Sequence, residues 1–138
     1  MKILFAADGS RYTKKALAFL MANESIAGDE LVVLNVQSAV PPRVKTMVGA
    51  QVIRDYHAEE AAKVLQPIER FLQRKGVPHR VSWTVGTPGD EIAKAARRER
   101  AHMIVMGSHG HGVIGRTLLG SVAQRVVTES DVPVLLVK

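Results

Sequence analysis

The chain has 138 residues and a mass of 15.0 kDa, which is the size of one ordinary domain. Hydrophobic residues make up 46% and charged residues 23%, a composition that excludes a disordered or membrane-spanning chain and predicts a soluble globular protein. The net charge is +6, yet the Lys and Arg residues are scattered and aromatic residues are few, so no specific nucleic-acid partner is expected. The absence of cysteine suits a cytoplasmic protein and excludes disulfides and thiolate metal sites.

Apolar runs and helical periodicities alternate along the whole chain. In chain order, the pattern predicts a strand over 3–7, a helix over 10–23, a strand over 31–36, a helix over 50–75, a strand over 80–85, a helix over 87–98, a strand over 103–106, a helix over 117–129 and a strand over 132–137. Pro67 should kink the long helix because proline cannot donate to the carbonyl four residues back. The stretch 38–49 holds two prolines and no acidic residue, and it is predicted to be a mobile loop that can cover a ligand crevice.

This alternation predicts one α/β doubly wound domain over residues 1–138, with a five-stranded parallel sheet and helices on both faces. Right-handed crossovers favour the strand order 3-2-1-4-5. In such a sheet, ligands bind beyond the carboxyl ends of the strands, at the switch point between the first and fourth strands. The segment 8–10 follows the first strand and a glycine-rich segment follows the fourth, so both should flank this crevice.

The glycine-rich segment, residues 106–122, carries five glycines within fourteen residues. Backbone without side chains can approach a ligand closely, and N–H groups at a helix start bind phosphate, so the segment indicates an anion site. Two familiar spacings fit poorly. Glycines 110, 112 and 115 match a dinucleotide fingerprint but only one further strand follows, and the Walker-like run 115–121 lacks its lysine. The glycines could also serve only a tight connection between strand and helix.

A third spacing fits better: Gly107-x-x-Gly110, nine residues, then Gly120-Ser121. It resembles the nucleotide-binding pattern of the universal stress protein family. The likeness covers essentially the whole chain, through Ala6-Ala7-Asp8-Gly9-Ser10, Leu34-Asn35-Val36, Gly86-Thr87-Pro88 and Pro133-Val134-Leu135-Leu136-Val137. Because the ATP-binding members of the family carry this glycine pattern, the resemblance implies the ATP-binding branch.

The resemblance also implies a set of site residues. The glycines and Ser121 would surround ribose and phosphates, Asp8 would lie near the adenosine moiety or a metal, and the Val36 backbone would lie beside adenine. The implied ATP-binding set is Ala7, Asp8, Val36, Met106, Gly107, Gly110, Gly120, Ser121 and Val122. His109 and Arg116 are candidates for phosphate contacts, and Asp8 is a candidate for Mg²⁺ or Mn²⁺ bound with the nucleotide. The sequence leaves open that Asp8 is simply a turn acid before the helix.

Together with the resemblance, these observations predict a cytoplasmic regulatory protein that binds ATP, or ADP or AMP. It is expected to act on unidentified protein partners and not to associate with a membrane. The sequence shows no catalytic nucleophile paired with a general base and no lysine placed to hold the phosphates, so hydrolysis of ATP should be slow at most. The strand from Val132 to Val137 should form an apolar sheet edge, which favours a homodimer through pairing with a second copy. The competing hypothesis is a dimerisation or adaptor module without nucleotide.

Overall fold

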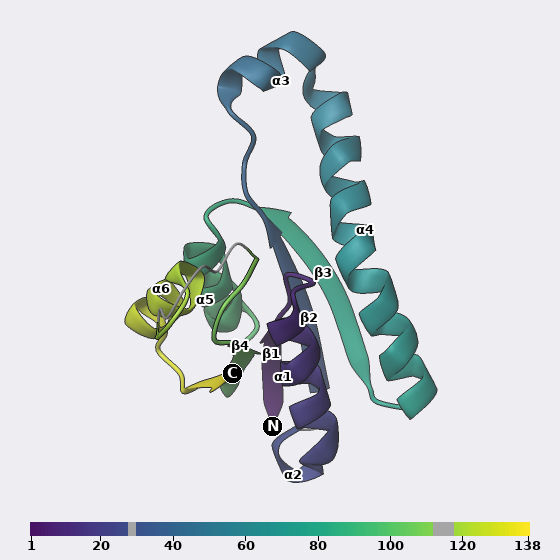
Figure 1. Cartoon of the computed structure of the whole chain (residues 1–138), viewed down its shortest axis with the longest axis vertical. Coiled ribbons are helices and arrows are strands. Elements are labelled where there is room, and N and C mark those ends of the chain that lie inside the picture. The colour runs from purple at the N-terminus through teal and green to yellow at the C-terminus, as the bar shows by residue number, and fades with distance from the viewer. Residues whose placement is uncertain (28–29, 112–117) are drawn as a thin grey trace.

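A computed structural model describes residues 1–27, 30–111 and 118–138 of the chain. Its five strands form one parallel sheet in the predicted order, β3-β2-β1-β4-β5 (Figure 1). The strands are β1 (Lys2–Ala6), β2 (Glu30–Gln37), β3 (His79–Val85), β4 (Met103–Gly107) and β5 (Val134–Val137). The helices are α1 (Arg11–Ala22), α2 (Glu24–Ala27), α3 (Pro42–Val48), α4 (Ala50–Lys75), α5 (Pro88–Arg98) and α6 (Ser121–Glu129).

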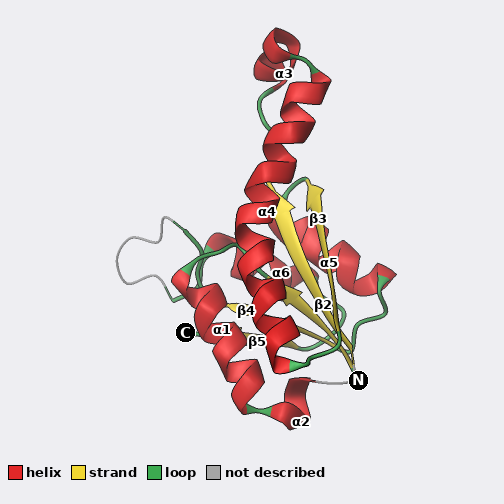
Figure 2. Ribbon diagram, turned by 90° about the vertical axis from the view of Figure 1, so that its right-hand side faces the viewer, coloured by secondary structure: helices red, strands yellow, loops and turns green. Residues whose placement is uncertain are grey.

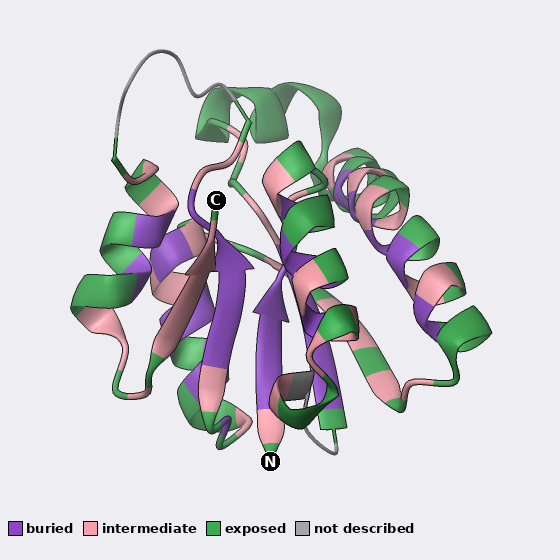
Figure 3. Cartoon of the chain, turned by 60° about the horizontal axis from the view of Figure 1, so that its bottom comes forward, coloured by how far each residue is buried: buried purple, intermediate pink, exposed green. Residues whose placement is uncertain are grey.

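Helices cover both faces of the sheet and create two hydrophobic cores. Helices α1 and α4 bury their apolar residues on one face, and α5 and α6 bury theirs on the other. Along β1, Ile3 and Phe5 enter the first core while Leu4 and Ala6 enter the second. Figure 3 shows the central strands buried and the helices exposed on their outer sides. Because both faces of the strands are covered, their sequences are continuously apolar instead of alternating.

The ends of the helices follow local capping chemistry. The Ser10 hydroxyl accepts a hydrogen bond from the N–H of Thr13 and caps α1. Gly76 ends α4 in the left-handed conformation with φ of 68°, and the next N–H, that of Val77, donates to the Leu72 carbonyl. Helix α4 includes Pro67 within its length. Thr87 is the N-cap of α5, as predicted, although its side chain makes no capping hydrogen bond.

The prediction of a loop over residues 38–49 was wrong for most of its length. Residues 42–48 form helix α3, which begins with Pro42 and is followed by Gly49, the C-cap, where φ is 88°. Proline in the first turn and glycine just past the end are typical of a short helix, because each residue is preset for its position. None of the residues of α3 is buried, and Figure 1 shows α3 and the start of α4 projecting beyond the sheet.

Helix α6 begins at Ser121, later than the predicted start at residue 117, which lies outside the described residues. Leu118 was expected on the buried face of this helix, but it precedes the helix and is 81% exposed. The N–H of Gly120 donates to the Ser108 carbonyl, and the extended backbone of Gly120 makes this residue the N-cap. This hydrogen bond therefore ties the start of the helix to the residue that follows β4. Smaller differences occur at strand ends, since β1 ends at Ala6 and β5 begins at Val134.

Candidate functional site

A cavity of about 530 Å³ lies at the carboxyl edge of the sheet, where β1 and β4 are neighbours. This is the switch point of the strand order, and the volume is in the usual range for small-molecule sites. The ends of β1, β2 and β4, the start of α5 and the first turn of α6 form its walls. The lining includes ten of the eleven residues predicted for the site: Ala7, Asp8, Val36, Met106, Gly107, His109, Gly110, Gly120, Ser121 and Val122. The eleventh, Arg116, lies outside the described residues.

Asp8 has the role in a turn that the sequence left open, and it also lines the cavity. Its Oδ1 accepts hydrogen bonds from the Ser10 N–H at 2.9 Å and from the Thr13 hydroxyl at 2.8 Å, so this oxygen organises the start of α1. Its Oδ2 faces Gly110, where an added β-carbon would lie only 2.5 Å away. The carboxylate therefore both caps a turn and forms part of the cavity wall.

The glycines of the site bring backbone segments close together, and none of the three described here needs a positive φ. An added β-carbon on Gly107 would lie 2.5 Å from the Tyr12 side chain of α1. One on Gly120 would lie 3.2 Å from the His109 Cα. Strand β4 can therefore pack against α1, and the turn at 108–110 can cross directly over the start of α6. The packing role that the sequence left open is real for these glycines.

The first turn of α6 presents to the cavity backbone donors that have no hydrogen-bond acceptor among the described residues. Gly120 is the N-cap and offers no side-chain acceptor, and the first hydrogen bond of the helix runs from the Gln124 N–H to the Gly120 carbonyl. The N–H groups of residues 121–123 precede that bond, and all three residues line the cavity. Such N–H groups, together with the positive end of the helix dipole, favour an anion.

Two histidines lie beside these donors. His109 is half-buried, its Nδ1 is 2.8 Å from the Ser108 hydroxyl, and its ring lies 5.1 Å from the Tyr12 ring. The His111 Nε2 lies 2.8 Å from the Asp8 carbonyl, so this nitrogen carries the proton and donates it. The second histidine therefore ties the glycine-rich segment to the end of β1.

Several residues that line the cavity or support its wall were not predicted from the sequence. Asn35 is 2% exposed, and its amide donates to the Ala7 carbonyl at 2.8 Å, which fixes the end of β1. Leu34 of β2 and Ile92 of α5 form part of the apolar wall, and Ser38 from the segment 38–49 also lines the cavity. A buried asparagine at the end of a strand is a signal that could have been used, because buried polar side chains require partners.

Few charged side chains line the described part of the cavity. Asp8 is the one carboxylate of the described lining, which contains no Lys or Arg. In residues 1–27, 30–111 and 118–138, no three Asp, Glu, His or Cys side chains gather as they would around a metal ion. Among the described lining residues, Asp8 is thus the one carboxylate that could contribute an oxygen atom to a bound cation.

Comparison with known proteins identifies the class. The model of the universal stress protein family matches residues 1–138. A universal stress protein of Thermus aquaticus is 35% identical over 99% of this chain and 97% of its own, and MJ0577 of Methanocaldococcus jannaschii is 30% identical over 99% and 94%. The chain belongs to the universal stress protein family.

Solved structures agree with this result. The structure of MJ0577 matches with a TM-score of 0.85 and 32% identity, covering 99% of this chain and 94% of that one. An Arabidopsis thaliana family member with AMP bound, at 20% identity and a TM-score of 0.71, shares the fold. No helix within the described part of the chain is long and apolar enough to cross a membrane.

Proposed function

We propose that this protein binds an adenine nucleotide, with ATP the expected ligand and ADP or AMP as alternatives, in the cavity at the carboxyl edge of the sheet. The observation that carries this proposal is the gathering of ten predicted residues around one cavity. Two proteins of the same fold, one with AMP bound and one in complex with cAMP, illustrate ligands that such a fold accommodates.

The wall of the cavity supports a division of roles. The N–H groups of residues 121–123 would hold phosphate, helped by the Ser121 hydroxyl and His109. The apolar residues Val36, Ile92 and Met106 would flank the adenine ring. Asp8 would repel phosphate directly, so it is better suited to a ribose hydroxyl or to Mg²⁺ or Mn²⁺ bound with the nucleotide.

The proposed role of the bound nucleotide is regulatory, and hydrolysis of ATP is expected to be slow at most. The described lining offers no lysine to stabilise charge that develops on a transferred phosphoryl group. The nucleotide state would instead bias a homodimer and the surface that protein partners recognise. The competing function, an adaptor module without nucleotide, gains support from the packing role of Gly107 and Gly120.

A thermal shift separates these two functions. On protein shown to be free of nucleotide, ATP with Mg²⁺ at roughly 100 times Kd should add about 2.7 kcal/mol to the free energy of unfolding, because it binds the folded state alone. For a chain of this size the melting temperature should rise by roughly 5–15 °C, and GTP should give a smaller shift. Unchanged melting with ATP, ADP and AMP would favour the adaptor.

A further inference from the structure

A second cavity, of about 470 Å³, lies in the groove between α1 and α4, on the face of the sheet away from α5 and α6. Figure 2 shows these two helices side by side in front of the sheet. Of the residues that line the nucleotide cavity, Thr13 also lines this groove. The groove is therefore adjacent to the first site and distinct from it.

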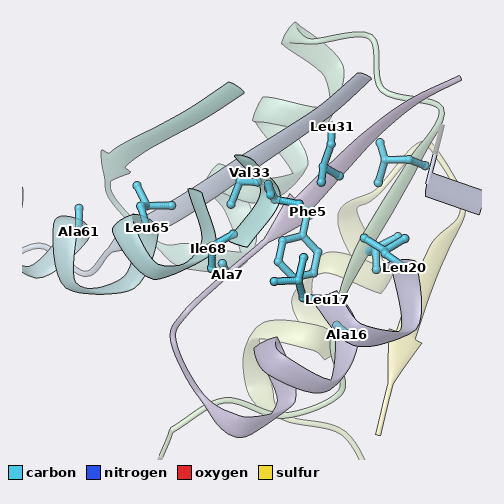
Figure 4. Close-up of a cluster of buried hydrophobic side chains, with 13 residues drawn as sticks. Phe5, Ala7, Ala16, Leu17, Leu20, Leu31, Val33, Ala61, Leu65 and Ile68 are labelled. Carbon is cyan, nitrogen blue, oxygen red and sulfur yellow. The ribbon is translucent and has the colours of Figure 1, made fainter. Parts of the chain in front are cut away.

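The floor and walls of the groove are apolar. Leu17 of α1 and Ile68 of α4 form the floor and belong to the core beneath, where Figure 4 shows both near Phe5. Val64 and Phe71, two further residues of α4, are only partly buried. Apolar surface is left open between the two helices, and covering it with an apolar ligand lowers the free energy of the system.

The rim of the groove is cationic. It carries Lys14 from α1 and Lys63 and Arg74 from α4, and no acidic side chain lines the described groove. The Lys63 ammonium donates to Glu60 at 2.8 Å, which raises the pKa of Lys63. Lys14 and Arg74 are exposed, and neither forms an ion pair with any described residue. Lys63 and Arg74 are eleven residues apart on α4, which is about 16 Å along the helix axis.

We propose that this groove is a second ligand site, for a small amphipathic anion that consists of an alkyl chain and one carboxylate head group. The open apolar floor fits the chain, and the exposed cations at the rim fit the head group. A volume of 470 Å³ between two helices of the same chain is that of a small-molecule site. The proposed ligand is a free amphiphile, because the floor residues Leu17 and Ile68 are buried between the two helices.

Titration calorimetry with decanoate below its micelle concentration tests the proposal, with decanol and decyltrimethylammonium as uncharged and cationic probes. Decanoate should bind to wild type, and the double variant Lys14→Gln/Arg74→Gln should weaken this binding by at least about tenfold. The matched control Arg54→Gln/Arg98→Gln removes two exposed cations elsewhere and should change the affinity less than about twofold. Ala18 is exposed and lines the groove, so Ala18→Phe should fill the site and abolish binding without disturbing the core.

Three results would overturn the proposal: decanol binding as tightly as decanoate, equal weakening in the control variant, or unchanged binding to Ala18→Phe. Binding of anionic vesicles without binding of decanoate would overturn it as well. The test does not depend on the nucleotide, because decanoate should bind equally well to Gly120→Val, in which the nucleotide cavity is altered.

Discussion

At the scale of single residues, Gly120 links the fold to the proposed function. Its N–H donates to the Ser108 carbonyl at 2.8 Å, and its missing side chain lets the turn at 108–110 approach the start of α6. The spacing of the glycines predicted that this residue lies at the site. It could not reveal that the nearest atoms belong to the protein's own backbone, because that approach depends on how β4 and α6 are placed in three dimensions.

Gly120→Val tests this residue. The added side chain would meet the backbone of His109 and Ser108 and displace the turn that shapes the phosphate site, so the affinity for ATP should fall at least tenfold, or ~1.4 kcal/mol. Titration calorimetry on the folded variant would show the change, with Arg54→Ala on α4 as the control. Wild-type affinity in Gly120→Val would remove this segment from the nucleotide site.

At the scale of elements, the edge strand β5 decides how a dimer could form. Ile104 donates its N–H to the Pro133 carbonyl and Ser108 donates to the Val137 carbonyl. Backbone N–H and C=O groups alternate in direction along a strand. The backbone groups of Leu135 and Val137 therefore point toward β4, and those of Val134 and Leu136, including their N–H groups, point outward. The sequence alone left this direction open.

The proposed homodimer therefore predicts different outcomes at neighbouring positions. Val134→Pro removes an outward N–H and should yield a folded monomer, whereas Leu135→Pro removes a hydrogen bond to β4 and should destabilise the sheet. Val134→Ala keeps the donor and serves as the control, which should remain dimeric. Size exclusion with light scattering gives the mass, and circular dichroism the fold. A wild-type monomer at tens of micromolar, ~10⁻⁵ M, would contradict pairing through β5.

At the scale of the whole molecule, a network of charges lies at the amino ends of β1, β2 and β3. Arg80 donates to Glu99 at 2.6 Å, and the Lys2 ammonium lies 3.3 Å from the same carboxylate. Glu30 lies 3.7 Å from Lys2 and 3.4 Å from Arg80. The hydrogen bond from Arg80 and, to a smaller extent, that from Lys2 lower the pKa of Glu99 to about 2, although burial acts in the opposite direction. The network joins three strands to the end of α5.

This pKa predicts how the stability depends on pH. Since the folded pKa lies below the ordinary value of 4.5, the ionised Glu99 stabilises the fold above pH 4.5, and this contribution is lost as the pH falls toward about 2. Glu99→Gln should lower the free energy of unfolding at pH 7 by about 1 kcal/mol, because its partner Arg80 is 46% exposed and solvent screens the pair, and by less at high salt. The difference from wild type should shrink between pH 4.5 and pH 2. Urea unfolding across this range, with the exposed Glu59→Gln as control, would contradict the prediction if the difference stayed constant.

The sequence by itself determined the order of the elements, the parallel sheet and the position of most of the site. These features depend on apolar periodicity, capping residues and a small set of allowed crossovers, all of which are local or topological. The residues after β1 and β4 had to meet at one edge because parallel strands place their carboxyl ends together. The start of α3 at Pro42 was also encoded locally, although its prolines were interpreted as a loop.

The tertiary structure decided what depends on distances between elements that are far apart in the sequence. The groove between α1 and α4, the contact of Gly107 with Tyr12 and the convergence of Lys2, Arg80 and Glu99 all depend on such distances. No periodicity encodes them, because each follows from how side chains of several helices and strands fill the same volume.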